Sequence, residues 1–165
     1  MFTLTRQQLQ HHQKSLPIDP RLLILQGGME YDVTPLPQAT CVMYRRNSGE
    51  LACLVDNNLT PQQATLAGTH ILGHAMLHQD RFEVGNRHED KLFESTLTLD
   101  GMFTADEERD ALMVGLEMII PKPILRHGFR VSNGDITTMA KAFGVPKMTI
   151  RRLCVREGLL DAKAA

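Results

Sequence analysis

Cysteine and long apolar runs are both scarce in this chain of 165 residues. Its three cysteines, Cys41, Cys53 and Cys154, are an odd number, lie far apart and form no CxxC pair. This argues against a disulfide framework and against a cysteine zinc site. No apolar run approaches the roughly 20 residues of a membrane span, and the polar N-terminus lacks the apolar stretch of a signal peptide. We therefore expect a cytoplasmic protein.

Charge is nearly balanced over the whole chain but is unevenly divided along it. Residues 1–121 carry 9 basic and 16 acidic side chains (net −7), whereas residues 122–165 carry 9 basic and 3 acidic (net +6). The change falls at Pro121 and Pro123, and the length suits one main core. We therefore predict a polar N-terminal arm (residues 1–17), a main domain (residues 18–121) and a basic helical subdomain (residues 122–165).

Short β-type runs indicate a small sheet early in the main domain. A helix predicted at residues 19–26 is followed by runs at residues 31–36, 40–45 and 51–56. The last two runs are joined by a hairpin turn at residues 47–49, Asn-Ser-Gly. We therefore expect an α+β fold in which a small antiparallel sheet is packed by helices.

Two capping boxes mark the start of two longer helices. Thr60 opens a predicted helix over residues 60–78, and Thr104 opens another that ends before Pro121. The polar stretch between them is long for a passive connection. We expect it to be irregular, with one short element near residues 91–99.

Three histidines recur at every fourth position of the first of these helices. His70, His74 and His78 therefore stack on one helical face. Two histidines at this spacing can direct ring nitrogens at one zinc ion, as in the HExxH motif, whose glutamate is the general base. Here the motif reads HILGH, with Ile71 in place of the glutamate. Spacing alone leaves a structural or surface role open, because such histidine pairs are common on helices.

The sequence around these histidines resembles a known family. Residues 65–78, TLAGTHILGHAMLH, are similar to the TLAHELGHxLLH stretch of the ImmA/IrrE metallopeptidases. In that family the third zinc ligand is an acid in a later segment that reads approximately E-A-N-x-F-A-x-x-L-L-M-P. Residues 110–121 align with that segment, with Asp110 in the ligand position. The resemblance covers about residues 18–121 and implies a zinc site at His70, His74 and Asp110.

Ile71 is the departure that bears most on activity. An isoleucine cannot polarise a metal-bound water or carry a proton, and loss of a positioned acid or base typically removes about 10²–10⁴-fold in rate. Family members act on helix-turn-helix repressors of mobile elements or stress responses, usually by cleaving them. We therefore expect a non-catalytic or weakly catalytic regulator that binds such a repressor. The alternative is an active zinc endopeptidase whose base comes from Glu108 or from the partner.

The remaining acids and histidines near the motif have ordinary interpretations as well. Glu107 and Glu108 could serve as ligand or base, but acids in a first turn more commonly complement the helix dipole. Asp110 is one methylene shorter than glutamate, which would reshape the site. His78 is either a group near the metal or a capping and packing residue. The other histidines are interpreted as solvated: His11, His12, His88 and His127.

The basic subdomain follows a helix-turn-helix pattern over residues 135–157. Ala140 is small where two helices would cross, and Gly144 can adopt the left-handed turn. The side chains expected to project from the second helix are Lys147, Thr149, Arg151, Arg152 and Arg156. They would contact DNA, which makes a DNA-binding regulator the second alternative. They would equally suit an acidic protein surface, and similar segments of ImmA/IrrE-like proteins serve in packing or partner contact.

Overall fold

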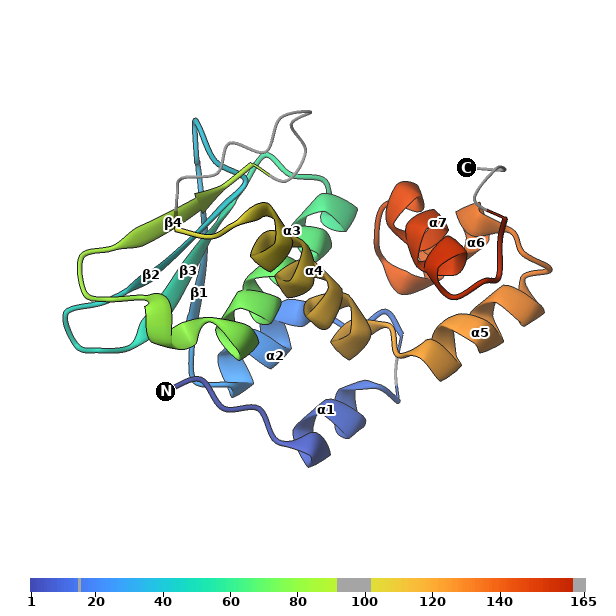
Figure 1. Ribbon diagram of the computed structural model, residues 1–165, viewed down its shortest axis with the longest axis horizontal. Helices are drawn as coiled ribbons and strands as arrows, with labels where there is room; N and C mark the ends of the chain where they lie inside the picture. The colour runs from blue at the N-terminus through green and yellow to red at the C-terminus, as the bar shows by residue number, and fades with distance from the viewer. Residues whose placement is uncertain (15, 92–101, 162–165) are drawn as a thin grey trace.

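The computed structural model describes residues 1–14, 16–91 and 102–161. A sheet forms one layer, helices cover one of its faces, and a helical group lies beyond them (Figure 1). The elements are α1 (Arg6–His12), α2 (Pro20–Gln26), β1 (Glu30–Thr34), β2 (Cys41–Arg45), β3 (Leu51–Asp56), α3 (Pro61–Leu77), η1 (Gln79–Arg81), β4 (Arg87–Asp90), α4 (Ala105–Ile119), α5 (Lys122–Val131), α6 (Ile136–Phe143) and α7 (Lys147–Arg156). The predicted α+β class is confirmed.

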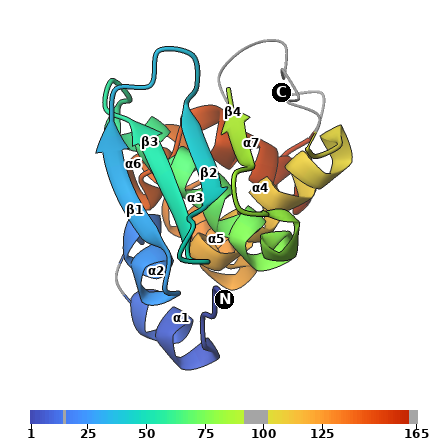
Figure 2. The same ribbon diagram turned by 90° about the vertical axis from the view of Figure 1, so that its left-hand side faces the viewer.

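The sheet has the order β1-β3-β2-β4 and is mixed (Figure 2). β2 pairs antiparallel with both β3 and β4, as the hairpin turn predicts for β2 and β3. β1 instead pairs parallel with β3, so the prediction of a purely antiparallel sheet is wrong. The β2–β3 hairpin returns the chain to the direction of β1 and places β3 between β1 and β2.

β4 lies in the stretch that the sequence predicts to be irregular. Its residue His88 pairs with Met43 of β2, which adds a fourth strand to the sheet. The strand is polar throughout, so its sequence carries no apolar alternation. The short element expected near residues 91–99 lies outside the described residues, apart from Lys91.

α3 and α4 cross with their backbones almost in contact. A Cβ on Gly73 would fall on the carbonyl oxygen of Ala111, and one on Gly115 would fall on that of Thr69. Only glycine permits so close an approach at these two positions. Because α3 is also buried without interruption from Leu66 to Ala75, it forms the centre of the core. Both predicted capping boxes are present, at Thr60 and Thr104.

The N-terminal segment and the basic subdomain are attached to this core. Phe2 is buried, and α1 has no fully buried residue but packs its partly buried Leu9 against the core. In the basic subdomain, the ring of Phe143 lies against Gly128 of α5. Arg156 of α7 pairs with Glu117 of α4 at 3.5 Å, which links the subdomain to the main domain. None of the helices in the described ranges is both long and apolar enough to span a membrane.

Candidate metal centre

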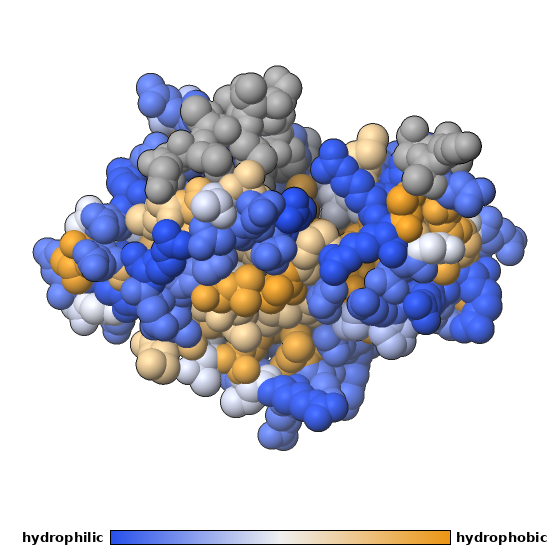
Figure 3. Space-filling model, in the orientation of Figure 1, coloured by the Kyte–Doolittle hydropathy of each residue, from blue (hydrophilic) through white to orange (hydrophobic). Residues whose placement is uncertain are grey.

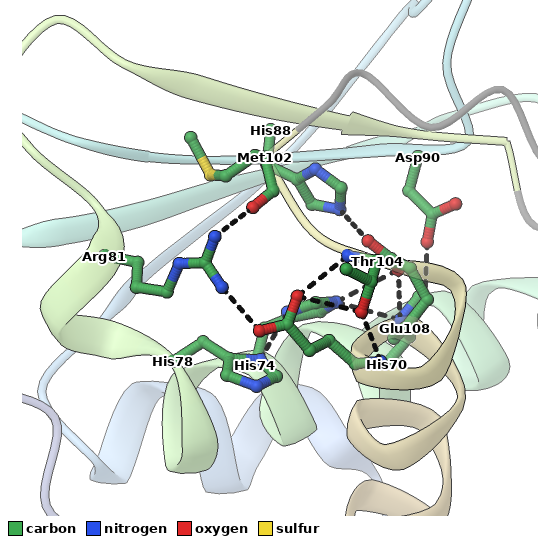
Figure 4. Close-up of polar contacts among 10 residues, drawn as sticks. His70, His74, His78, Arg81, His88, Asp90, Met102, Thr104 and Glu108 are labelled. Carbon is green, nitrogen blue, oxygen red and sulfur yellow. Dashed lines mark hydrogen bonds and ion pairs between the residues drawn. The ribbon is translucent and has the colours of Figure 1, made fainter.

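A cluster of buried polar side chains lies where α3, α4 and β4 meet (Figure 4). α3 contributes His70 and His74, α4 contributes Glu108, and β4 contributes His88 and Asp90. Their exposed fractions are 2%, 2%, 4%, 5% and 6% respectively. Buried ionisable groups are costly unless they are paired or ligate a metal, so this cluster requires an explanation beyond packing.

Three atoms of the cluster form a small triangle. His70 Nε2 lies 3.0 Å from His74 Nε2 and 3.0 Å from Glu108 Oε2. His74 Nε2 lies 3.2 Å from Glu108 Oε2. In a tetrahedral zinc site with bonds near 2 Å, ligand atoms are separated by about 3.3 Å. Two imidazoles and one carboxylate are also a common zinc donor set. The described residues therefore include a group that could hold a metal ion.

Each of the three side chains that form this triangle also contacts another side chain through its remaining polar atom. His70 Nδ1 lies 2.5 Å from Asp90 Oδ2, and His74 Nδ1 lies 3.1 Å from His78 Nδ1. His88 Nε2 lies 3.2 Å from Glu108 Oε1, the carboxylate oxygen that is not in the triangle. Outer contacts of this kind orient metal ligands and hold their free lone pairs toward the ion.

The protonation of the cluster follows from burial and from these contacts. Burial alone would lower the pKa of His70, but the carboxylates of Asp90 and Glu108 outweigh it and raise this pKa to about 9. Burial and the neighbouring histidines lower the pKa of His74 to about 4, despite Glu108. His70 therefore carries a proton at neutral pH. Its positive charge lies beside the carboxylate of Glu108 and partly neutralises it. A bound metal cation would take over that role.

Glu108 is a poor proton acceptor in this setting. Burial would raise its pKa, but the contacts from His70, His74 and His88 hold it well below the usual range. The carboxylate therefore stays ionised, as a metal ligand must, and its low pKa makes it too weak a base for general-base catalysis near neutral pH.

An aromatic ring closes the cluster on one side. Phe103 is 3% exposed, and its centroid lies 4.5 Å from that of His74 and 4.9 Å from that of His88. The guanidinium of Arg81 lies over the same ring, 4.8 Å from its centroid. Arg81 is fixed by Glu107 at 2.5 Å and by the carbonyl of Met102. Phe103 therefore shields the histidines from solvent.

A second group of potential ligands shares Glu108. His88, Asp90 and Glu108 also have ligand atoms close enough to hold a metal ion. However, Asp90 contacts His70 and His88 contacts Glu108. Both β4 residues thus support the first group, so we treat the His70, His74 and Glu108 triangle as the candidate centre.

The structure brings together only part of the ligand set expected from the sequence. His70 and His74 are adjacent, but Asp110 is exposed and lies outside both metal-capable groups. Two residues along a helix turn the side chain by about 200°. Since Ala111 faces α3 at Gly73, Glu108 one turn earlier points inward and Asp110 points away. The structure therefore places Glu108, and not Asp110, beside the two histidines, where it could serve as the third ligand.

Two further residues of the motif have definite places. Ile71 is 2% exposed and belongs to the hydrophobic core, so position 71 supplies packing and no acid or base. His78 is half-buried at the end of α3, caps that helix and contacts His74.

The two β4 residues of the cluster were not anticipated. The interpretation of His88 as solvated is wrong, because the strand buries it. Asp90 is not among the site residues that the sequence predicts. The only local signal is their spacing of two residues, which puts both side chains on one face of a strand. That signal becomes readable only once the polar stretch is known to be a strand.

The predicted partner-binding side chains lie on α7, away from the metal centre. Lys147, Arg152 and Arg156 are exposed, and Thr149 and Arg151 are half-buried. Arg156 is paired with Glu117, so it ties α7 to α4.

No protein-family model matches the sequence, and no curated protein matches it significantly.

Proposed function

We propose that this protein is a divergent ImmA/IrrE-like regulator that binds zinc without acting as a peptidase. The observation that carries the proposal is the buried triangle of His70, His74 and Glu108 beside a core isoleucine at position 71. The donor set fits zinc, whereas no proton-transferring group stands at the position that carries the base in the resembled motif.

The side chains of the site have roles suited to holding a metal. His70, His74 and Glu108 would bind it, and zinc when bound would supply Lewis acidity. Asp90 and His88 orient His70 and Glu108, and Phe103 keeps bulk water away from the rings. Three protein ligands leave the fourth position of a tetrahedral zinc ion to a water molecule or to a group of the partner.

The proposed partner is a repressor of the helix-turn-helix class. The resemblance of residues 65–78 supports this choice, and the surface near the motif offers an apolar contact. Met76 and Leu77, at the end of α3, are 41% and 46% exposed. Apolar side chains gather over α3 and α4 near the middle of the face in Figure 3. Exposed apolar side chains that cluster next to a site favour protein contact.

An active endopeptidase is the competing function. It would need a base other than residue 71, and Glu108 is unsuitable because three histidines lower its pKa so far that the carboxylate is a weak base. A base supplied by the partner would satisfy this alternative.

Two experiments test the proposal. Metal analysis of the purified protein should find one zinc per chain, which Glu108→Gln removes and Asp110→Asn retains. These acids lie on the same helix, so the pair is matched. The protein should also bind, without cleaving, the helix-turn-helix repressor encoded nearest to it. Cleavage by the wild-type chain would refute the non-catalytic assignment, and Ile71→Glu serves as the variant in which a carboxylate is restored.

A further inference from the structure

The basic subdomain contains a complete helix-turn-helix unit. α6 ends at Gly144, whose φ of +67° is the left-handed conformation that the turn requires. The amide of Val145 donates to the carbonyl of Ala140 at 3.2 Å, and Pro146 then starts α7. The motif buries these residues: Met139, Ala140, Phe143, Val145, Ile150, Leu153 and Cys154.

A third helix completes this unit. α5 packs on α6 at Gly128, where an added Cβ would lie 2.9 Å from the ring of Phe143 and 3.8 Å from the end of Met139. In three-helix DNA-binding domains of this kind, the last helix enters the major groove, and residues along its exposed face contact bases and phosphates.

The basic side chains near this helix fall into two sets. Lys122 and Arg126 both pair with Glu157, and Arg156 pairs with Glu117. Within the described part of the chain, Arg151 and Arg152 have no acidic partner, and Lys147 forms no ion pair, although its charge helps to lower the pKa of Asp135. The first set joins the end of α7 to α5 and to α4. The second set leaves positive charge uncompensated on one face of α7.

We propose that this face of α7 binds duplex DNA. Lys147, Arg151 and Arg152 supply charges for phosphates, and Thr149 supplies a hydroxyl donor of the kind that contacts phosphate oxygens. Arginine can also read guanine through two parallel hydrogen bonds. The function is independent of the metal centre, because no residue of α7 belongs to it.

The charge distribution along the chain limits the number of phosphate contacts and so determines how the affinity for DNA depends on salt. Residues 1–121 are net −7 and repel phosphates, so attraction is confined to the basic subdomain. Few phosphate contacts are then available, and each contributes about one unit to the slope of log K against log salt, so affinity falls less steeply with salt than for proteins that make many such contacts.

Fluorescence anisotropy of the full chain with a labelled 20-base-pair duplex tests the proposal. At 50 mM salt we expect the wild-type chain to bind the duplex. In the double variant Arg151→Ala/Arg152→Ala, we expect the affinity to fall at least about tenfold. We also expect the slope of log K against log salt to decrease in magnitude by about 2. The matched control is Lys122→Ala/Arg126→Ala, which removes equal charge from paired residues of the same subdomain. Thermal unfolding checks that both variants fold.

Two results would overturn the proposal. The first is no binding to the duplex at 50 mM salt and micromolar protein. The second is an equal loss of affinity in both double variants, which would show that only net charge matters.

Discussion

Gly73 of α3 lies directly against the carbonyl oxygen of Ala111 of α4, with no room for a side chain between them. This contact sets the rotation of α4 relative to α3 and thereby aims Glu108 at His70 and His74. The glycine of the histidine motif is therefore a determinant of the site's third ligand, 35 residues away in sequence (108 minus 73).

Substitution of Gly73 should consequently damage both fold and site. We expect Gly73→Ala to lower the free energy of unfolding by about 3 kcal/mol or more, because the new methyl forces the helices apart. The matched control is Gly68→Ala on the same helix, where a Cβ would approach the side chains of Pro20, at 3.0 Å, and Ile24, at 3.9 Å. Alanine's higher helix propensity should largely offset that contact. Urea unfolding measures both variants, and equal stability would contradict the role of Gly73.

The buried carboxylate behind His70 should strengthen metal binding. Asp90→Asn removes the charge that orients and polarises the ring, and we expect zinc affinity to fall about 10–100-fold. Glu89→Gln is the control, because Glu89 pairs with Arg87 outside the cluster. Competition with a chromophoric chelator gives both affinities. Similar values for the two variants would show that Asp90 does not act through His70.

Metal binding should release a proton at neutral pH. His70 carries a proton up to a pH near 9 because its pKa is raised from 6.5, and a zinc ligand must be deprotonated. Binding titrations by calorimetry in two buffers of different ionisation enthalpy should therefore differ by about one proton per zinc. Identical enthalpies in the two buffers would contradict the protonation assigned to His70.

His70 and His74 should make the metal-free protein less stable on both the acid and the alkaline side of neutral pH. The raised pKa of His70 stabilises the fold fully below pH 6.5, and this contribution is lost as pH rises through about 9. The pKa of His74 is lowered to about 4, so its contribution is present above pH 6.5 and is lost as pH falls toward 4. Urea unfolding across pH 4–10 in the presence of a chelator should show a maximum near neutrality. In His70→Gln the decline on the alkaline side should be weaker.

Phe103 should slow the escape of a bound metal. Phe103→Leu leaves a gap over His74 and His88, so we expect zinc loss to a chelator to be at least several-fold faster. Phe82→Leu is the control, since the ring of Phe82 is also buried and its centroid lies 5.7 Å from that of Phe103. Both changes should cost about 1–3 kcal/mol in stability. Stopped-flow measurement of zinc transfer to a chelator compares the two variants. Equal rates of zinc loss from both would argue that Phe103 does not shield the site.

Local sequence was sufficient where the determining contacts are local. The capping boxes at Thr60 and Thr104 mark the starts of α3 and α4, and the four-residue spacing puts His70 and His74 on one face. These features depend on helical periodicity and on hydrogen bonds within one turn.

The remaining parts of the site depend on contacts between distant segments. The choice of Glu108 over Asp110 follows from the crossing at Gly73, which no feature of α4 alone reveals. β4 has neither β-branched nor apolar residues, and its pairing with β2 alone makes it a strand. His88 and Asp90 could therefore not be assigned before the sheet was known.

The stripe of imidazoles on α3 also connects the interior to the surface. Asp90, His70, His74 and the half-buried His78 follow one another through contacts of 2.5, 3.0 and 3.1 Å between successive ring or carboxylate atoms. Each ring can accept a hydrogen ion at one nitrogen and pass one on from the other. As long as no metal occupies the two Nε2 atoms, the helix that presents the ligands thus joins the buried Asp90 to the protein surface by an unbroken row of polar contacts.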